Sequence, residues 1–594
     1  MSFKYNMRKV SQFFVFSIIL GLLMFATIMR LDRIGHRPIH HDESLHALYG
    51  KYFHDSPKTH YYKYDPLLHG PLLYHLIPYA YHVGGQSLES GRMISVICGL
   101  LLVLTPFFFR RLFSPFTLWT LVLYGAISPT LIYWSRFLRE DMIILFCMAS
   151  LLIGVTLIKK PLWKVFSVSA SIGLILCTKE NYFITFSLLF IYLMVEFIFL
   201  VLSKNYSSSL LGKLLLFLRL NWGVSLLGLA FCALIVSYFY TAGFQYTQGI
   251  KDFVFAKGFQ YWIGQHQHER LTGPFSFHVL LLSWYEFPIA FLWLFLVCYF
   301  FIQFPVAMSI TTFISMSMAL TTYLLCRHFG NINEWVGAYL KLKTTLDFPV
   351  FFGSLSFGLT GTLYFLGRNK RSHAFFFYFA SATLFAYSYA GEKVPWLSLY
   401  PFIASLAFFA VWSRDFNLNL NLLSRGTTFL LVLITGAMLG TQAALSYYVN
   451  FSKAGGKEEL LSQVHTTPQY EDILIALRRE TLARETPLHI LLYRENAWPG
   501  AWFLYGIPEV AYTTNDTLRA SYDVVLTSYK DSEFRNLGYQ EYDIPFRWWW
   551  VPDYQQMGPK EFFRYLFQRT PWNNTGIMSI TIYYKEAMKP VLGI

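Results

Sequence analysis

The chain has 594 residues, of which 55% are hydrophobic and 19% aromatic, whereas only 14% are charged, and its mean hydropathy is +0.40. A soluble protein of this length needs far more charge to cover its surface, so the composition excludes a soluble globular protein. The net charge of +14 does not indicate nucleic-acid binding, because the basic residues form no single stripe and many lie in short loops.

The chain begins with an apolar run that follows Lys4, Arg8 and Lys9. No small-x-small cleavage site comes after this run, so we expect an uncleaved transmembrane helix with a cytoplasmic N-terminus. Runs of similar length recur up to residue 447 and predict about thirteen transmembrane helices. Their expected extents are 10–29, 92–109, 116–133, 142–158, 164–177, 182–203, 222–240, 277–303, 305–326, 347–366, 373–390, 395–412 and 427–447.

The loops between these runs alternate in charge. Every second loop is basic and Asp415 is the one acidic residue among them, which by the positive-inside rule places these loops in the cytoplasm. The remaining loops are long, aromatic and mixed in charge, and they should face outward. We therefore expect a multi-pass protein of the plasma (inner) membrane, with its C-terminus and its unusual polar clusters on the extracytoplasmic face.

After Tyr447 the composition changes. Charged helix-like segments at 468–485 and 559–569 alternate with β-rich runs at 488–493, 522–526 and 577–583. This alternation predicts a small α/β domain. We expect two domains: a transmembrane catalytic domain over 1–447 and an extracytoplasmic α/β domain over 448–594.

The first outward loop opens with His40-His41-Asp42-Glu43-Ser44, and Asp65 and His69 follow in Tyr64-Asp65-Pro66-Leu67-Leu68-His69-Gly70-Pro71. Carboxylates are costly inside a membrane, so an acidic pair at the point where the chain leaves the bilayer needs an explanation. Asp42 and Glu43 could simply mark the end of the hydrocarbon. The spacing of His41 and His46 is not that of H-E-x-x-H and does not predict a zinc site.

Further polar clusters follow in the later outward loops. Each cluster alone is more often a solvated loop than a site, but their gathering on one face favours a site. They are Arg136, Arg139, Glu140 and Asp141; Lys179-Glu180-Asn181; Gln265, His266 and Arg270; Glu286; and Glu392, Lys393 and Trp396.

Group transfer from a lipid-anchored donor would use such a set. Its phosphate needs cations, its acceptor needs a carboxylate base, and a sugar needs aromatic surfaces. Asp42 is the candidate base, and Trp262, Trp396 and the run 548–550 are candidate sugar platforms, although that run could equally lie in a membrane interface. The candidate phosphate ligands are Arg136, Arg139, Arg270 and Lys393.

These motifs resemble those of the GT-C superfamily of polyprenyl-phosphate-dependent glycosyltransferases, which includes protein O-mannosyltransferases and the aminoarabinose transferases of lipid A. The ordered set is most similar to a subfamily labelled flippase-associated. The resemblance covers about residues 30–450 and implies a GT-C fold, an α-helical polytopic membrane protein with a small C-terminal α/β domain.

The resemblance also implies roles for single residues. Asp42 matches the essential first-loop carboxylate, a general base or acceptor-orienting group, and Glu43 would position the acceptor. Glu140 and Asp141 match a second acidic position that in some relatives helps to bind a divalent metal, so Asp42 and Asp141 are candidate ligands for Mg or Mn. The expected substrate-binding residues are Asp65, His69, Gln265, His266, Glu286, Glu392 and Trp396.

The expected function is therefore an inverting glycosyltransferase. It would move a hexose or pentose from a polyprenyl-phosphate donor to an extracytoplasmic lipid, surface glycan or protein. The alternative is a flippase or transporter for lipid-linked sugars without catalysis. A transporter should carry ionisable groups near the bilayer midplane, where the sequence offers few, Glu196 among them. A third possibility is a catalytically silent scaffold whose tail binds glycan or a partner.

Overall fold

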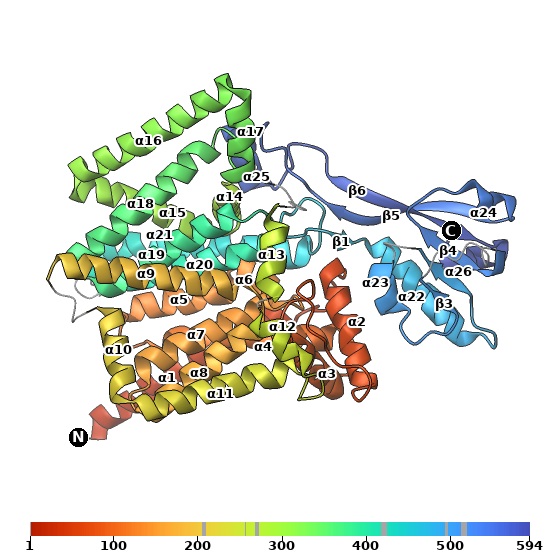
Figure 1. Cartoon of the computed structure of the whole chain (residues 1–594), viewed down its shortest axis with the longest axis horizontal. Coiled ribbons are helices and arrows are strands. Elements are labelled where there is room, and N and C mark those ends of the chain that lie inside the picture. Colours follow the sequence, from red (N-terminus) through yellow and green to blue (C-terminus); the bar gives the residue numbers. More distant parts are fainter. Residues whose placement is uncertain are drawn as a thin grey trace.

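The computed structural model describes residues 2–204, 209–255, 257–267, 273–416, 424–493, 497–512 and 520–594. Figure 1 shows two parts along the longest axis, a bundle of helices that carries the N-terminus and a sheet that carries the C-terminus. The helices of the bundle are α1 (Ser2–Leu31), α4 (Leu88–Phe108), α5 (Pro115–Ile127), α6 (Pro129–Ser135), α7 (Asp141–Leu157), α8 (Pro161–Leu176), α9 (Tyr182–Leu202), α10 (Leu210–Leu220), α11 (Trp222–Tyr240), α14 (Phe277–Tyr285), α15 (Phe287–Gln303), α16 (Pro305–His328), α18 (Asp347–Gly367), α19 (Arg371–Tyr389), η2 (Pro395–Ser398), α20 (Leu399–Trp412), η3 (Ser413–Phe416), α21 (Arg425–Tyr447) and η5 (Tyr448–Ser452).

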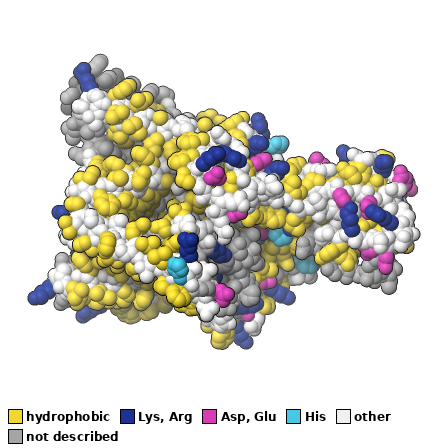
Figure 2. Space-filling model, turned by 90° about the horizontal axis from the view of Figure 1, so that it is seen from above, with side chains coloured by type: hydrophobic (Ala, Val, Ile, Leu, Met, Phe, Trp, Pro, Cys, Tyr) yellow, Lys and Arg dark blue, Asp and Glu magenta, His cyan; other side chains and the backbone are white. Residues whose placement is uncertain are grey.

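Every predicted span coincides with one of these helices or with two consecutive ones. Among the described residues, seven helices are long and apolar enough to cross a membrane, or up to nine if each of two bent pairs is one span; three shorter apolar helices accompany them. In Figure 2 hydrophobic side chains cover much of the helical part, whereas charged ones gather at the junction and on the sheet part. The chain is a multi-pass membrane protein, and the predicted fold class, helical with a small C-terminal α/β domain, is confirmed.

Both bent pairs are held by Glu286. The α5–α6 pair bends by 52° at Ser128, which caps α6, and the α14–α15 pair bends by 113° at Glu286 itself. The Glu286 carboxylate accepts hydrogen bonds from the Ser128 hydroxyl (2.6 Å), the Thr130 amide (3.0 Å) and the Gln442 side chain (3.0 Å). One buried carboxylate thus joins the two bends and α21.

The segments that are predicted to face outward contribute five further helices. α2 and α3 pack against each other so closely that a Cβ on Gly50 would lie 2.2 Å from Ile77 Cγ2. This close approach explains the glycine, because any side chain there would push the helices apart. The five helices are α2 (His41–Asp55), α3 (Leu72–Gly84), α12 (Gln248–Val254), α13 (Lys257–Gln267) and α17 (Gly330–Tyr339).

The C-terminal part is a six-stranded sheet of order β1-β5-β6-β4-β2-β3, with β2 parallel to β3 and β4 and the other pairs antiparallel. Its strands are β1 (His465–Thr466), β2 (Ile490–Leu492), β3 (Val510–Ala511), β4 (Val524–Thr527), β5 (Gln540–Trp549) and β6 (Gly576–Tyr584). Its helices are α22 (Pro468–Ala483), α23 (Ala497–Phe503), α24 (Ser532–Asn536), α25 (Pro559–Gln568), η8 (Glu586–Met588) and α26 (Lys589–Leu592).

The sheet docks directly on the residues that precede α2. His40 forms an isolated β-bridge with His465, and the Thr466 amide donates to the Ile39 carbonyl (3.2 Å). Further along α2, the Lys51 ammonium lies 3.5 Å from the centroid of the Trp502 ring of α23. The segment from Ile39 to Lys51 therefore contacts the sheet part at two places.

Candidate active site

Two segments of the chain that are predicted to face outward meet at one end of the bundle. One is the first turn of α2, where His40 is the N-cap and forms a capping box with Glu43. The other is the turn between α6 and α7, which ends at Asp141, the first residue of α7. Because both helices begin here with acidic residues, their N-terminal amides favour carboxylates at this point.

Asp42, Arg139, Asp141 and Lys179 form a chain of alternating charges. Asp42 is bound by the guanidinium of Arg139, whose Nε also donates to Asp141 Oδ2 (3.2 Å). The Lys179 ammonium lies 3.2 Å and 3.3 Å from the two oxygens of Asp141. Arg139, Asp141 and Lys179 are buried, whereas the side chain of Asp42 is 30% exposed. Of the two carboxylates in this row of charges, Asp42 is therefore the one that a substrate can reach.

Neighbouring charges determine whether Asp42 and Arg139, at the accessible end of this row of charges, carry a proton. Burial alone would raise the pKa of Asp42, but Arg139 and the neighbouring histidines bring it well below its ordinary value. Burial lowers the pKa of Arg139, yet Asp42 and Asp141 bring it above its ordinary value. Asp42 is therefore ionised at neutral pH, and it becomes a better proton acceptor only when Arg139 is drawn away.

An aromatic wall backs the charged chain. The Arg139 guanidinium lies 3.8 Å from the centroid of the Trp396 ring, a cation–π contact. The Tyr400 hydroxyl donates to Asp141 Oδ1 (2.8 Å), and the Tyr400 ring stacks on Tyr387 at 5.0 Å. Trp396, predicted to bind substrate, thus lies against a predicted phosphate-binding cation.

Glu43 is turned away from the open side and is wholly buried. Its oxygens accept two hydrogen bonds from Arg92 (2.9 and 2.7 Å) and one from the Leu138 amide (2.8 Å), and Arg37 lies at 3.6 Å. These contacts occupy the carboxylate and tie α2 to α4 and to the turn before α7. They favour a structural role over the predicted positioning of the acceptor.

Glu140 is also fully buried, and among the described residues neither of its oxygens accepts a hydrogen bond. The nearest titratable partner is His46, whose Nε2 lies 3.6 Å from Glu140 Oε1. The other ring nitrogen of His46 lies 2.7 Å from the Tyr74 hydroxyl. Glu140 therefore faces His46 of α2, and its charge also acts on Arg139.

Two of the predicted phosphate-binding cations bind backbone instead. Arg136 donates to carbonyl oxygens at the end of α1, that of Asp32 among them (2.6 Å). Lys393 is buried and donates to the carbonyl oxygens of Ser388 and Ala390 at the end of α19. Both contacts are typical of cations at helix C-termini.

A second cluster, around His69, adjoins the charged chain through consecutive residues of one loop. Glu180, next to Lys179, lies 2.8 Å from His69 Nδ1, and the His69 ring stacks on Trp262 at 5.4 Å. Asp65 is exposed and accepts a hydrogen bond from the Leu67 amide (3.0 Å). Asp65 thus stabilises its own turn, whereas Glu180 and Trp262 fix the position of the His69 ring.

The remaining predicted site residues are placed only in part. Gln265 and His266 belong to α13, but their side chains lie outside the described residues, as does Arg270 entirely. Glu392 is half-buried in the turn after α19. Their roles in binding substrate or phosphate stay predictions.

The donor set does not fit a divalent metal. Among the described residues, no three His, Cys, Asp or Glu side chains are grouped so that they could hold a metal ion. Asp42 and Asp141, the predicted ligands, instead meet the cations Arg139 and Lys179, which would compete with a metal. A divalent metal at these two carboxylates therefore stays a prediction that the charge arrangement does not favour.

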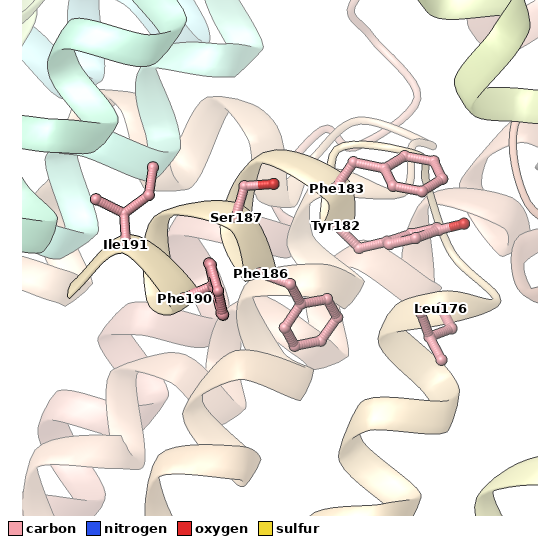
Figure 3. A pocket seen from close by; sticks show the side chains of 7 residues that line it. All are labelled: Leu176, Tyr182, Phe183, Phe186, Ser187, Phe190 and Ile191. Carbon is pink, nitrogen blue, oxygen red and sulfur yellow. The ribbon is translucent and has the colours of Figure 1, made fainter. Parts of the chain in front are cut away.

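An apolar hollow begins next to the last cation of this row of charges. The Tyr182 amide donates to the carbonyl of Lys179, so the first residue of α9 lies in the same turn as the last cation. The hollow has a volume of about 550 Å³. Figure 3 shows that its side chains come from the beginning of α9 and the end of α8: Leu176, Tyr182, Phe183, Phe186, Ser187, Phe190 and Ile191.

Sequence reasoning missed several residues of the site. Lys179 was noted as part of a charged loop but not as a partner of Asp141, because pairing across loops cannot be read from the sequence. Arg92 stands at the beginning of a predicted span, and an ionisable residue there is a signal that could have found it. His46 enters the sequence analysis only as a possible metal ligand, and Tyr400, inside a predicted span, carries no signal.

No protein-family model matches the sequence, and no curated protein matches it. Among solved structures, the chain is similar to the crystal structure of ArnT from Cupriavidus metallidurans in the apo state, with 12% identity, a TM-score of 0.43, and coverage of 97% of this chain and 98% of that one. The crystal structure of ArnT from the same organism bound to undecaprenyl phosphate gives 13% identity, a TM-score of 0.42, and coverage of 96% and 97%. At these values the function has to be argued from the site.

Proposed function

We propose that this protein is an inverting membrane glycosyltransferase that uses a polyprenyl-phosphate-linked sugar. One observation carries the proposal: the charged chain from Asp42 to Lys179 ends in the same turn at which the apolar hollow of α9 begins. A polyprenyl-phosphate sugar has the same order of parts, an apolar tail, an anionic phosphate and a polar head. The hollow would take the tail, and the cations beside it would take the phosphate.

The reaction joins the acceptor to the anomeric carbon of the sugar. The acceptor oxygen attacks this carbon from one face while the bond to the phosphate oxygen breaks on the other, and polyprenyl phosphate leaves with the electron pair. The acceptor proton passes to the Asp42 carboxylate. Holding both substrates at one place supplies the proximity that the step requires.

Arg139 links phosphate binding to the base. It binds Asp42 before the donor arrives, and a phosphate would compete with Asp42 for this guanidinium. When Arg139 turns to the phosphate, the pKa of Asp42 rises toward its ordinary value and the carboxylate becomes a better proton acceptor. Trp396, against which Arg139 is stacked, would then border the sugar.

The flippase alternative requires no base at all. A transporter should also carry its ionisable groups near the bilayer midplane. Here Arg139 follows α6, Asp141 begins α7 and Lys179 precedes α9, so these charged groups lie in turns at helix ends. This placement favours catalysis at the membrane surface, on the predicted extracytoplasmic side.

The test uses the full-length protein in lipid nanodiscs with labelled polyprenyl-phosphate sugars and a membrane extract as the source of acceptors. We expect release of polyprenyl phosphate from one donor, and a loss of about 100-fold or more in the Asp42→Asn variant, because general-base catalysis typically contributes 10²–10⁴-fold. The matched control is Asp55→Asn, at the other end of α2. The side chain of Asp55 is 34% exposed, close to that of Asp42, and it should keep wild-type activity.

Release that persists in Asp42→Asn would contradict the assignment of the base. A protein that binds the donors but releases no polyprenyl phosphate from any of them would instead support the flippase or the scaffold. Equal losses in both aspartate variants would indicate damage to α2 rather than to the chemistry.

A further inference from the structure

Helix α25 of the sheet domain has two opposite faces. Tyr565 is fully buried, and Phe562 and Leu566 are half-buried on the same side. The other side carries Phe563, which is 52% exposed, and Phe567, which is 77% exposed. Their rings stack on each other with centroids 6.2 Å apart. Two adjacent exposed phenylalanines on one short helix are unusual for a surface that only water covers.

Cations accompany these rings. Lys560 and Arg564 precede Phe563 and Phe567 by three residues, and the spacing puts all four on one side of the helix. Lys560 is exposed, whereas Arg564 is half-buried and its guanidinium donates to the Pro571 carbonyl. A helix with an aromatic face edged by lysine and arginine is typical of segments that lie in a membrane interface, because the cations meet lipid phosphates.

The inner face of α25 is fixed to the bundle at a bend of the membrane helices. Trp284 Nε1 donates to the Phe562 carbonyl (3.3 Å), and the hydroxyls of Tyr285 and Tyr565 lie 2.9 Å apart. Trp284 and Tyr285 are the last residues of α14, and α15 begins two residues later. α25 thus sits at the end of a candidate membrane span.

The surface beyond this bend is apolar. Phe291 and Leu294 on α15 are exposed, and at 1.5 Å per residue Phe291 lies only about 6 Å along the helix from Phe287. At the same end of the bundle, α17 also exposes aromatic side chains, those of Trp335 and Tyr339. Figure 1 shows α25 and α17 where the bundle ends and the sheet part begins.

We infer that α25 is an interfacial helix, which inserts Phe563 and Phe567 into the outer lipid leaflet while Lys560 contacts lipid phosphates. The occupant of this face is lipid because the apolar surface of α15 ends at the bend that holds α25. The contact joins the sheet domain to the bilayer at a second place, besides the covalent link through α21. The inference is independent of the proposed function.

The test measures whether lipid reaches this face. Single cysteines at Phe563→Cys or Phe567→Cys carry an environment-sensitive fluorophore, in full-length protein whose more accessible native cysteines, Cys232 and Cys298, are serine. The protein is placed in nanodiscs with lipids that bear a nitroxide near the head group. The matched control is Leu537→Cys, at the C-cap of α24 in the same domain, where the native residue is 47% exposed.

We expect the nitroxide lipids to quench the probes at 563 and 567 at least about twofold, because such helices lie within the head-group region. The probe at 537 should not change. Equal behaviour of all three probes would overturn the inference. A blue-shifted but unquenched signal at 563 and 567 would overturn it too, because protein, such as a second copy of the chain, would then cover the face. Thermal melting of each labelled variant establishes that it is folded.

Discussion

At the scale of single residues, Asp42 and Glu43 are neighbours in sequence with opposite environments. The side chain of Asp42 is partly exposed and pairs with one cation, Arg139. Glu43 is instead enclosed by Arg92, Arg37 and the Leu138 amide. The direction of each side chain follows from the helix, since consecutive residues point about 100° apart. The acidic pair can be recognised in the sequence, but the division of its roles depends on the distant residues that each carboxylate meets.

The Glu43→Gln variant should unfold more readily while Asp42→Asn should not. Removing the charge of Glu43 leaves Arg92 buried without a counter-ion, which typically costs about 3–5 kcal/mol. We expect a clearly lower melting temperature for Glu43→Gln in nanodiscs, measured by intrinsic fluorescence, and a wild-type value for Asp42→Asn. A wild-type melting temperature with lost activity in Glu43→Gln would assign Glu43 to acceptor positioning instead.

Lys179 lies in the same turn as Tyr182, which lines the apolar hollow, and replacing Lys179 should weaken donor binding. Hydrogen bonds to charged groups contribute about 1.5–3 kcal/mol, so Lys179→Gln should raise the KM for the donor by about tenfold or more. Initial rates at varied donor concentration measure this effect, with the exposed Lys63→Gln as the control. A fall in kcat at unchanged KM would contradict a role in ground-state binding of the phosphate.

The sequence predicts which residue types make up the candidate site, but only some of the contacts between them. Charges at the ends of predicted spans indicate a shared site, and Asp42, Arg139, Asp141 and Trp396 lie in contact with one another. The assignment of Arg136 and Lys393 to the phosphate rests on their charge alone. Their carbonyl partners at helix ends are backbone groups, which leave no trace in the sequence.

At the scale of elements, the apolar runs predicted the helices well because a membrane demands continuous apolar length. The sequence did not predict the two bends, because each bend depends on a single polar residue. One bend lies at Ser128, before a proline, and the other at Glu286. The sequence did not predict strand β5 either. It contains Pro545 and a register shift beside it, and it ends in the tryptophan run that was weighed as a sugar platform. Within that run, Trp548 donates to the Gly455 carbonyl (2.8 Å) and Trp550 to Asn573 (2.8 Å).

Glu286 should matter for the bends more than for substrate. A glutamine there keeps one carbonyl oxygen but turns the other oxygen into an amide N–H₂, so one pair of buried donors loses its acceptor, either Ser128 and Thr130 on Oε1 or Tyr124 and Gln442 on Oε2. Each unsatisfied donor costs about 1–3 kcal/mol. We expect Glu286→Gln to lower the melting temperature while the folded fraction keeps the KM for the donor. A wild-type melting temperature with a raised KM would support the predicted role in substrate binding.

At the scale of the whole molecule, the sheet docks on the bundle through a group of buried histidines. Burial lowers the pKa of His40 and His41 to about 4, with Arg139 acting against a charge on His40 and Arg547 against one on His41. His465 is shifted in the same direction, again mainly by burial. Its ring lies 2.8 Å from the Tyr133 hydroxyl and 3.1 Å from the Pro38 carbonyl, so it bridges both parts.

These shifts make the interface sensitive to acid. Between pH 6.5 and about 4 the unfolded chain binds protons at these histidines that the folded chain does not, so the free energy of unfolding falls as pH falls. Glu471 opposes this trend, because burial raises its pKa to about 7 and the folded state takes up its proton first. Three histidines against one carboxylate leave a net loss of stability between pH 6.5 and 4.5.

The melting temperature should therefore fall from pH 7 to pH 5, and limited proteolysis should release the sheet domain more readily at pH 5. His465→Gln removes one titrating group while its amide can still bond to Tyr133 and Pro38, so the pH dependence should become shallower. The control is His82→Gln, an exposed histidine on α3, which should retain the wild-type slope. If His465→Gln also retained it, the acid response would arise elsewhere, because a buried interface histidine that stays neutral must weaken docking when it is forced to bind a proton.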